Sequence, residues 1–199
     1  MSTTQCSSHQ RVIIGISGAS GFSYGVQALR YLRQLNVESH VVISSAAHLN
    51  RRLETTLSEK DIQDLADVVY PFEDIGADIA SGSFRATGML IAPCSMHTLA
   101  AVAAGFSSNL LTRAADVTLK ERRRLILMVR ETPLHAGHLR HMLPVTEAGG
   151  IIFPPVPAWY ARPVSTANIT AHSVARSLRL LDPACNACPS RGSLLPPDT

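Results

Sequence analysis

Lysine is nearly absent from this chain of 199 residues, in which 18 Lys and Arg residues face 15 Asp and Glu residues. Only Lys60 and Lys120 are lysines, so almost all of the positive charge is on arginine. The formal net charge of +3 is too small to favour nucleic acid as a partner. Arginine suits bidentate binding of phosphate better than it suits a general basic coat.

Long hydrophobic runs are also missing, because no apolar stretch reaches the roughly 18 residues that a membrane-spanning helix needs. The first ten residues, MSTTQCSSHQ, lack the apolar centre of a secretion signal. We therefore expect a cytoplasmic protein without membrane insertion. Charged residues make up 17% of the chain and hydrophobic residues 46%, which predicts a large buried sheet and a homo-oligomer.

Cysteine is too scarce for a disulfide framework in a cytosolic chain of this size. The four are Cys6, Cys94, Cys185 and Cys188. The last two have the spacing of a metal or redox pair, but no second ligand pair accompanies them, so thiols are the simpler interpretation. His135, His138 and His141 recur on one expected helix without a suitably spaced carboxylate or cysteine. No metal site is expected.

The stretch from Arg11 to Gln34 organises the rest of the chain. Apolar residues 12–16 run into the small residues 17–21, and apolar residues then recur at helical spacing from Tyr24. This pattern predicts a strand, a tight turn and a helix whose first N–H groups could hold a phosphate. Its G-x-x-G-x-x-G spacing differs from the known dinucleotide and P-loop patterns, so a turn used only for packing stays an alternative.

Strands and helices alternate through the rest of the sequence. We expect further strands at 39–44, 68–70, 88–92, 125–129 and 151–153. We expect further helices at 46–55, 57–65, from the end of a turn at 93–98 to about 104, at 109–122, 134–148 and from Ser165 to about 181, with Pro133 in a first helical turn. Residues 76–85 are expected to form a loop, and residues 154–160 must be extended.

This alternation predicts an α/β fold, a three-layer doubly wound and mostly parallel sheet of five to seven strands. One domain is expected over residues 11–182, between a polar N-terminal tail (1–10) and a Pro-rich C-terminal tail (183–199). Ligands of such folds sit at the carboxyl ends of strands. The unusual polar residues fall there, at 17–20, at Ser44, at 95–98 and at Arg130 with Glu131. The expected ligand is a flat, phosphorylated cofactor.

From about Arg11 to Asp182 the sequence resembles the UbiX/Pad flavin prenyltransferases, formerly described as aromatic-acid decarboxylases. The motifs that carry the resemblance are ISGASG with Tyr24-Gly25, LET at 53–55, SGSF at 81–84, PCSMHTLA at 93–100, LLTRAADVTLKERR at 110–123, RETPL with His138-Leu139, and PPVPAWY with Pro163. The long run RAADVTLKERR followed by RETPL is highly specific.

The resemblance implies a flavodoxin-like or Rossmann-like flavoprotein that assembles as a homododecamer. It implies that reduced FMN is alkylated at N5 by dimethylallyl phosphate and that ring closure to C6 gives prenylated FMN, without a metal. The product would serve a UbiD-type decarboxylase, for example in ubiquinone synthesis.

The resemblance also implies roles for particular residues. FMN would be held by Gly18, Ala19, Ser20, Ser44, Ser95, Met96, His97, Thr98 and Arg130. The phosphate of the substrate would meet Arg113, Lys120, Tyr160 and Arg176. Glu131 would transfer a proton, with Glu54 and Ser20 assisting. These types suit the chemistry, since fixed cations stabilise a departing phosphate and a carboxylate can accept a ring proton.

Simpler interpretations stand beside these roles. Arg113 and Lys120 lie about two helical turns apart and could be solvated surface. Glu131 could form an ion pair with Arg130, and Tyr160 could be an ordinary packed aromatic residue. His97 could cap a helix instead of contacting the flavin.

The chain departs from the family pattern at Ser45, where many members have lysine, at Ala167-Asn168, and in the tail after Asp182. Two other functions remain open from the sequence. One is an enzyme like the flavin-dependent cysteine decarboxylases, although a Pro-x-Met-Asn-type substrate clamp is not found. The other is a non-catalytic flavin-binding subunit.

Overall fold

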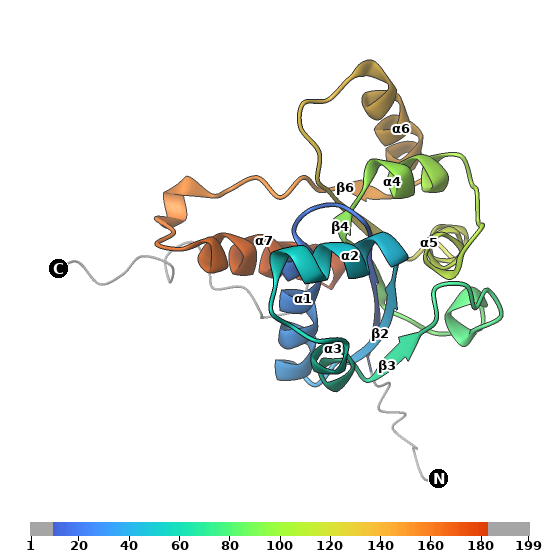
Figure 1. Ribbon diagram of the computed structural model, residues 1–199. Coiled ribbons are helices and arrows are strands. Elements are labelled where there is room, and N and C mark those ends of the chain that lie inside the picture. The colour runs from blue at the N-terminus through green and yellow to red at the C-terminus, as the bar shows by residue number, and fades with distance from the viewer. Residues whose placement is uncertain (1–9, 183–199) are drawn as a thin grey trace, which may run out of the picture.

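Alternating strands and helices build one six-stranded sheet within residues 10–182, the part of the chain that this computed structural model describes (Figure 1). The strands are β1 (Arg11–Ile16), β2 (Glu38–Ile43), β3 (Val68–Tyr70), β4 (Gly88–Cys94), β5 (Arg124–Val129) and β6 (Ile151–Ile152). The helices are α1 (Phe22–Gln34), α2 (Ser45–Glu54), α3 (Glu59–Leu65), α4 (Met96–Ala103), α5 (Leu110–Lys120), α6 (Ala136–Glu147) and α7 (Thr166–Leu181), with short 3₁₀ turns η1 (Asp78–Ala80) and η2 (Trp159–Ala161).

The strand order is β3-β2-β1-β4-β5-β6, and every neighbouring pair is parallel. This is the order of the doubly wound dinucleotide-binding folds, so the predicted fold class is confirmed. On one side of β1 the sheet continues with β2 and β3. On its other side it continues with β4, β5 and β6. Ligands of such sheets bind where the order reverses, which places the expected site at the carboxyl ends of β1 and β4.

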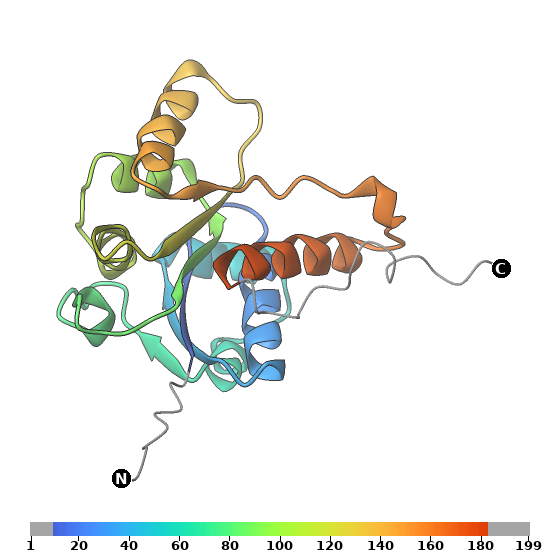
Figure 2. The same ribbon diagram turned by 180° about the vertical axis from the view of Figure 1, so that it is seen from behind.

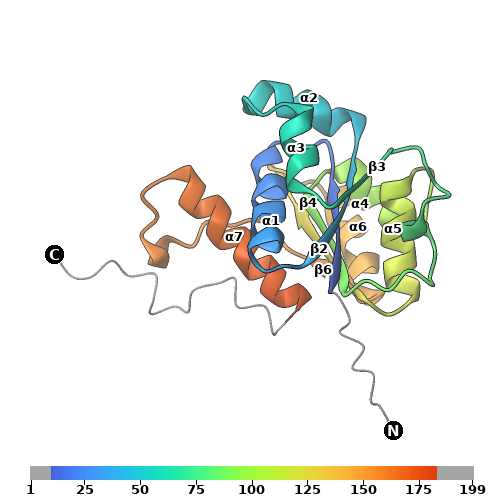
Figure 3. The ribbon, with the colours of Figure 1, turned by 90° about the horizontal axis from the view of Figure 1, so that it is seen from below.

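The two faces of the sheet are covered by different helices. Val12, Ile14 and Ile16 of β1 pack with buried residues of α1 and α7, whereas Ile13 belongs to the core under α4 and α5. This alternation follows from the two-residue period of a strand. Figure 3 shows α1 and α7 on one side of the sheet and α5 on the other. Figure 2 shows the segment before α7 extending away from the sheet together with the start of that helix.

Some expected elements differ from those observed. Pro133 does not open a helix: the Thr132–Pro133 peptide bond is cis, and α6 starts only at Ala136, after His135 accepts a hydrogen bond from Gly137 N at 3.0 Å. Residues 76–85 include η1, and the segment expected to be extended through Tyr160 turns at η2. The strand expected through Phe153 ends at Ile152.

No helix within the described residues is long and apolar enough to cross a membrane. The cytoplasmic location stays a prediction. The expected N- and C-terminal tails, with Cys6, Cys185 and Cys188, lie outside the described residues apart from Gln10. Cys94 is a fully buried free thiol at the end of β4, and burial raises its pKa far above the ordinary value.

Candidate functional site

The first loop of the candidate site, residues 17–21, leaves β1 at the point where the strand order reverses. Ser17 is 1% exposed, whereas Ser20 is exposed. Among the described residues, no group accepts a hydrogen bond from the N–H of Gly18 or Ser20. A Cβ on Gly18 would lie 2.5 Å from the Cβ of Ala46. The glycine therefore permits a close approach to α2, whatever the loop binds.

The start of α1 is already occupied by a carboxylate of the chain itself. Glu54 Oε2, at the end of α2, accepts from the N–H of Gly21 at 2.9 Å and of Phe22 at 2.8 Å. A negative group is favoured at this end of a helix dipole. Our prediction that this helix start holds a phosphate is therefore narrowed: Glu54 takes up two of its N–H groups, and the loop before it offers those of Gly18 and Ser20. Glu54, expected to assist catalysis, is hydrogen-bonded to the last residue of that loop and to the first residue of α1.

The second loop follows β4 and begins α4. Ser95 caps this helix, since its Oγ accepts from Thr98 N at 3.2 Å and donates to Thr98 Oγ1 at 3.1 Å. His97 is exposed and does not cap the helix, contrary to one of its two expected roles. Within the described chain, the N–H groups of Met96 and His97 have no acceptor. The loop thus presents two backbone donors at the positive end of α4.

Neighbouring strands add further polar groups to this edge. Ser44 caps α2 by accepting from Ala47 N at 3.2 Å, and its own N–H donates to Ile16 O at 2.9 Å. Arg130 is exposed after β5, and its N–H donates to Cys94 O at 3.1 Å. The structure therefore brings the expected FMN residues to one edge of the sheet, although Ala19 and Thr98 are largely buried.

Tyr24, which the sequence analysis placed on the helix face and among the motifs of the resemblance but gave no role, lies near Arg130. Burial raises the pKa of its phenol, and the nearby charge of Arg130 opposes that increase. The hydroxyl therefore stays protonated at neutral pH and can donate a hydrogen bond beside the Arg130 guanidinium. No residue spacing in the sequence relates the first turn of α1 to the residue that follows β5.

The residues expected to hold the substrate phosphate divide into two pairs. Arg113 and Lys120 lie on α5, where Arg113 pairs with Asp116 at 2.9 Å and Lys120 with Glu121 at 2.5 Å. These contacts are partly exposed, and such surface pairs contribute little, so an anion can displace them at small cost. The pairing with Lys120 lowers the pKa of the Glu121 carboxyl.

Tyr160 and Arg176 form the other pair, in a groove of about 390 Å³ between the segment after β6 and α7. Its walls combine the apolar side chains of Phe153 and Val156 with the polar ends of Tyr160, His172 and Arg176. The rings of His172 and Tyr160 meet edge to face with centroids 5.9 Å apart. The groove can hold a short apolar chain that ends in an anion.

His172 was missed by the sequence reasoning, although it lies one helical turn before Arg176 on α7. Burial and then the charge of Arg176 lower the pKa of its imidazole, so it is neutral at physiological pH. The i, i+4 spacing to Arg176 was the available signal.

One chain cannot bring the two pairs together. The inward residues of α5 belong to the core on one face of the sheet, and those of α7 belong to the core on the other. Figure 3 shows the two helices separated by the strands. The expected set of four phosphate ligands is therefore split within the described chain.

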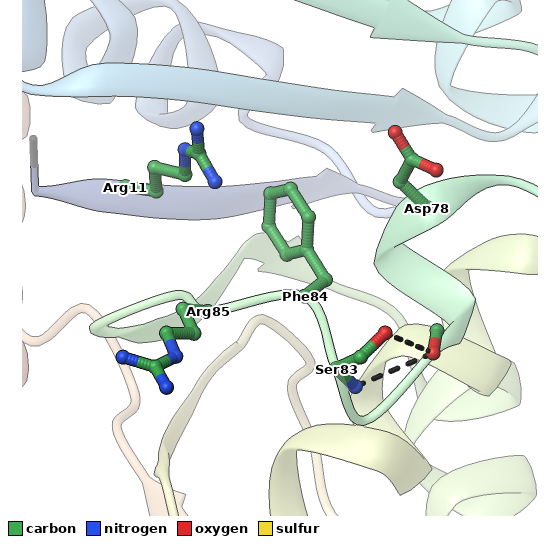
Figure 4. A pocket seen from close by; sticks show the side chains of 6 residues that line it. Arg11, Asp78, Ser83, Phe84 and Arg85 are labelled. Atoms are coloured by element: carbon green, nitrogen blue, oxygen red, sulfur yellow. Dashed lines mark hydrogen bonds between the residues drawn. The ribbon is translucent and has the colours of Figure 1, made fainter.

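A second hollow, shown in Figure 4, lies near the start of β1 and is lined by Arg11, Asp78, Ser81, Ser83, Phe84 and Arg85. Arg11 lies over the Phe84 ring at 5.3 Å and pairs with Glu38 at 3.0 Å. The hollow contains charges of both signs and lies at the amino end of β1. It is not part of the candidate site at the carboxyl ends.

His135 and His138, at the start of α6, lie close together but are not joined by further potential metal ligands among the described residues. The ring centroids of His135 and His138 are 3.6 Å apart, and no group of three His, Cys, Asp or Glu residues between Gln10 and Asp182 could hold a metal ion.

Glu131 is exposed after β5, and its Oε1 accepts from Thr132 N at 2.9 Å. It makes no ion pair with Arg130 among the described contacts.

Comparison with known proteins decides the family. Residues 1–176 match the family model described as Flavoprotein. The chain is 60% identical over 171 residues to the flavin prenyltransferase UbiX of Neisseria meningitidis, covering 86% of this chain and 90% of the relative. The chain belongs to the UbiX flavin prenyltransferase family. The predicted resemblance and enzyme class are thereby confirmed.

Solved structures agree with this assignment. A crystal structure of AnUbiX (PadA1) in complex with FMN and dimethylallyl pyrophosphate has a TM-score of 0.88 and 46% identity, covering 92% of this chain and 97% of the other. A dodecameric FMN-dependent UbiX-like decarboxylase from Escherichia coli O157:H7 has a TM-score of 0.84 and 45% identity, covering 86% and 93%. This member of the family thus shares the fold of proteins that bind FMN.

Proposed function

We propose that the chain transfers the dimethylallyl group of dimethylallyl phosphate to N5 and C6 of reduced FMN, giving prenylated FMN. The observation that carries this proposal is the pair of loops at the carboxyl ends of β1 and β4, in which the N–H groups of Gly18, Ser20, Met96 and His97 have no acceptor in the described chain. The residues there fit a flavin phosphate and the polar edge of a flavin ring. FMN acts as the substrate that accepts the prenyl group.

The flavin would lie across the two loops, with Gly18, Ala19 and Ser20 on one side and the residues 95–98 on the other. Ser44 and Arg130 border the same edge, and the guanidinium of Arg130 can pair with an anionic group. Tyr24 adds a phenol beside Arg130. This arrangement is supported by the shared edge of the sheet and by the family membership.

Each complete phosphate site would combine residues from different copies of the chain. Tyr160 and Arg176 of one copy would meet Arg113 and Lys120 of another, because the sheet separates the two pairs within one copy. A homododecamer is the proposed assembly, supported by the related dodecameric protein. Exposed apolar residues also support an assembly: they gather on α6 and around η2, and they include Leu139, Leu143, Val156, Trp159 and Val164.

The residues account for the bonds that change. When the allylic C–O bond breaks, the phosphate leaves with the electron pair, and arginine, lysine and the Tyr160 hydroxyl stabilise its added charge. The flavin nitrogen supplies the electrons of the new N5–C bond. The released phosphate can give a proton to the inner carbon of the remaining alkene, so that the outer carbon accepts electrons from C6 and forms the second bond, and the proton then lost from C6 passes to the Glu131 carboxylate. Apolar groove walls would exclude water from the allylic fragment.

The product would be consumed by a separate UbiD-type decarboxylase. This partner is inferred from the nature of the product, a modified cofactor that this chain does not need for the transfer itself.

The direct test incubates the purified protein anaerobically with reduced FMN and dimethylallyl phosphate, followed by mass spectrometry of the extracted flavin. We expect a flavin that has gained one five-carbon unit, and no gain when the donor is omitted. Bound but unmodified FMN would favour a non-catalytic flavin-binding subunit. Decarboxylation of a cysteine-ended peptide, without prenylation, would favour the cysteine decarboxylase alternative.

A further inference from the structure

Ser17 connects the two flavin loops directly, although it is buried below them. Its Oγ donates to Pro93 O at 3.0 Å and accepts from Ser95 N at 2.7 Å. Its own N–H also donates to Pro93 O, at 3.1 Å. With 1% of its surface exposed, its side chain is almost fully enclosed. One hydroxyl therefore joins the end of β1 to the first residue after β4.

The Ser17 hydroxyl takes the place of a backbone carbonyl as the acceptor for Ser95 N. In a regular parallel ladder, the N–H of Ser95 would donate to the carbonyl of Ser17. That carbonyl instead accepts from Ala19 N at 2.9 Å, because the chain turns there into the first loop. The side chain supplies the missing acceptor. The first loop can thus turn away from the sheet while the second loop remains attached.

The location gives this link its importance. After β1 the chain continues to α1 on one face, and after β4 it continues to α4 on the other face. The loops diverge here, and the regular β1–β4 pairing ends at Gly15 and Ile91. The link is therefore positioned to fix the separation of the loops where a ligand would enter.

We propose that Ser17 is a positioning residue for the flavin, whose hydroxyl sets the distance between the N–H donors of Gly18 and Ser20 and those of residues 96–97. The inference deepens the proposed function and rests on it. Ser17 does not contact the reacting atoms. Its loss should change flavin affinity, while binding of the prenyl donor in the groove near Arg176 should remain the same.

The test compares Ser17→Ala with Ser17→Thr, which keeps the hydroxyl, and with Ser177→Ala as a matched control. Ser177 is fully buried, and its Oγ donates only to Val174 O in its own helix, at 2.8 Å. For each variant the FMN dissociation constant, the melting temperature and the KM for dimethylallyl phosphate at saturating FMN are measured. If Ser17→Ala fails to fold, Ser17→Cys is measured in its place, since a thiol is a weaker hydrogen-bonding group of similar shape.

We expect Ser17→Ala to raise the FMN dissociation constant about tenfold, without a change in the KM for the donor. Ser17→Thr should restore most of the affinity, and Ser177→Ala should lower the melting temperature without weakening FMN. Parent-like FMN affinity in Ser17→Ala, or an equal loss in Ser177→Ala, would overturn the proposal. If Ser17→Ala weakens FMN binding as expected but the parent protein forms no prenylated flavin, the proposed function is refuted and this inference stands.

Discussion

At the scale of single residues, Glu131 offers the sharpest test of the chemistry. Its side chain is exposed at the edge of the sheet that carries the two candidate loops, next to Arg130. In Glu131→Gln the shape and hydrogen bonding are kept, but the side chain cannot accept a proton. We expect FMN to bind as in the parent while single-turnover prenylation falls about 100-fold or more.

The matched control for this change is Glu147→Gln, at the exposed end of α6, which should keep the parent rate. Rapid-quench measurement with reduced FMN would record both rates. A Glu131→Gln protein as fast as the parent would mean that the released phosphate, not this carboxylate, takes the ring proton.

Another residue-scale prediction concerns stability and pH. His40 on β2 is 3% exposed, with Nε2 2.9 Å from Glu38 Oε1 and Nδ1 2.9 Å from the Tyr70 hydroxyl. Burial lowers its pKa from the ordinary value of 6.5, and the Glu38 carboxylate only partly offsets this. Below that value the unfolded chain binds a proton that folded His40 does not, so stability should fall as the pH drops below about 6.5.

Urea midpoints at pH 7.5, 6.5 and 5.5 would measure this dependence. We expect His40→Gln to be less stable at pH 7.5, because two buried hydrogen bonds are changed, but to lose less stability on acidification. His141→Gln, which replaces an exposed histidine of α6, should keep the parent slope. Since the lowered pKa of Glu38 acts only below its ordinary value of 4.5, it should not affect this range. Equal slopes in all three proteins would exclude His40 as the source.

At the scale of elements, the loop at residues 81–84 holds the end of α5 that carries Lys120. Arg123 donates to Gly82 O at 2.9 Å and to Phe84 O at 2.5 Å. A Cβ on Gly82 would overlap the carboxylate of Glu121 and lie 2.8 Å from Lys120 Nζ. Because these are the ends of flexible side chains, they can move aside without unfolding the loop.

Gly82→Ala should therefore leave the melting temperature and the FMN affinity nearly unchanged while raising the KM for dimethylallyl phosphate roughly three- to tenfold. Gly76→Ala is the matched control, because a Cβ there would meet only Asp74 Oδ1, at 3.6 Å. Steady-state kinetics of the two variants would decide the matter. The same KM in both would show that the position of Lys120 does not matter for the donor.

At the scale of the whole molecule, the division of the phosphate residues between two faces predicts complementation between copies. Lys120→Ala and Arg176→Ala should each be nearly inactive alone. Coexpressed, they should form mixed oligomers in which roughly a quarter of the sites are complete, if each site takes one residue from each of two copies.

Each variant carries a different tag, so that purification through both tags selects the mixed oligomers. The prenylation activity of these oligomers measures the fraction of complete sites. Mixing the two separately purified variants without subunit exchange is the control and should restore nothing. Mixed oligomers as inactive as either single variant would show that both residues are needed from the same copy.

Local order in this protein was determined by the sequence itself. The apolar run from Arg11 and the helical spacing that follows specified β1 and α1, because the periods of strand and helix are properties of consecutive residues. Ser44, Ser95, Asn109 and Ser165 cap helices as their residue types favour. The alternation of elements also fixed the fold class and placed the polar residues at strand ends.

The tertiary structure decided what depends on distant contacts. Only the strand order brought residues 17–20 beside 95–98, and only the packing of α5 and α7 on opposite faces separated Lys120 from Arg176. Glu54 reached the start of α1 from 32 residues away in sequence, a contact without a local pattern. Pro133, a favourable first helical residue by type, lies outside α6. Neighbouring residues set propensities, whereas the geometry of a site depends on which elements share an edge and a face of the sheet.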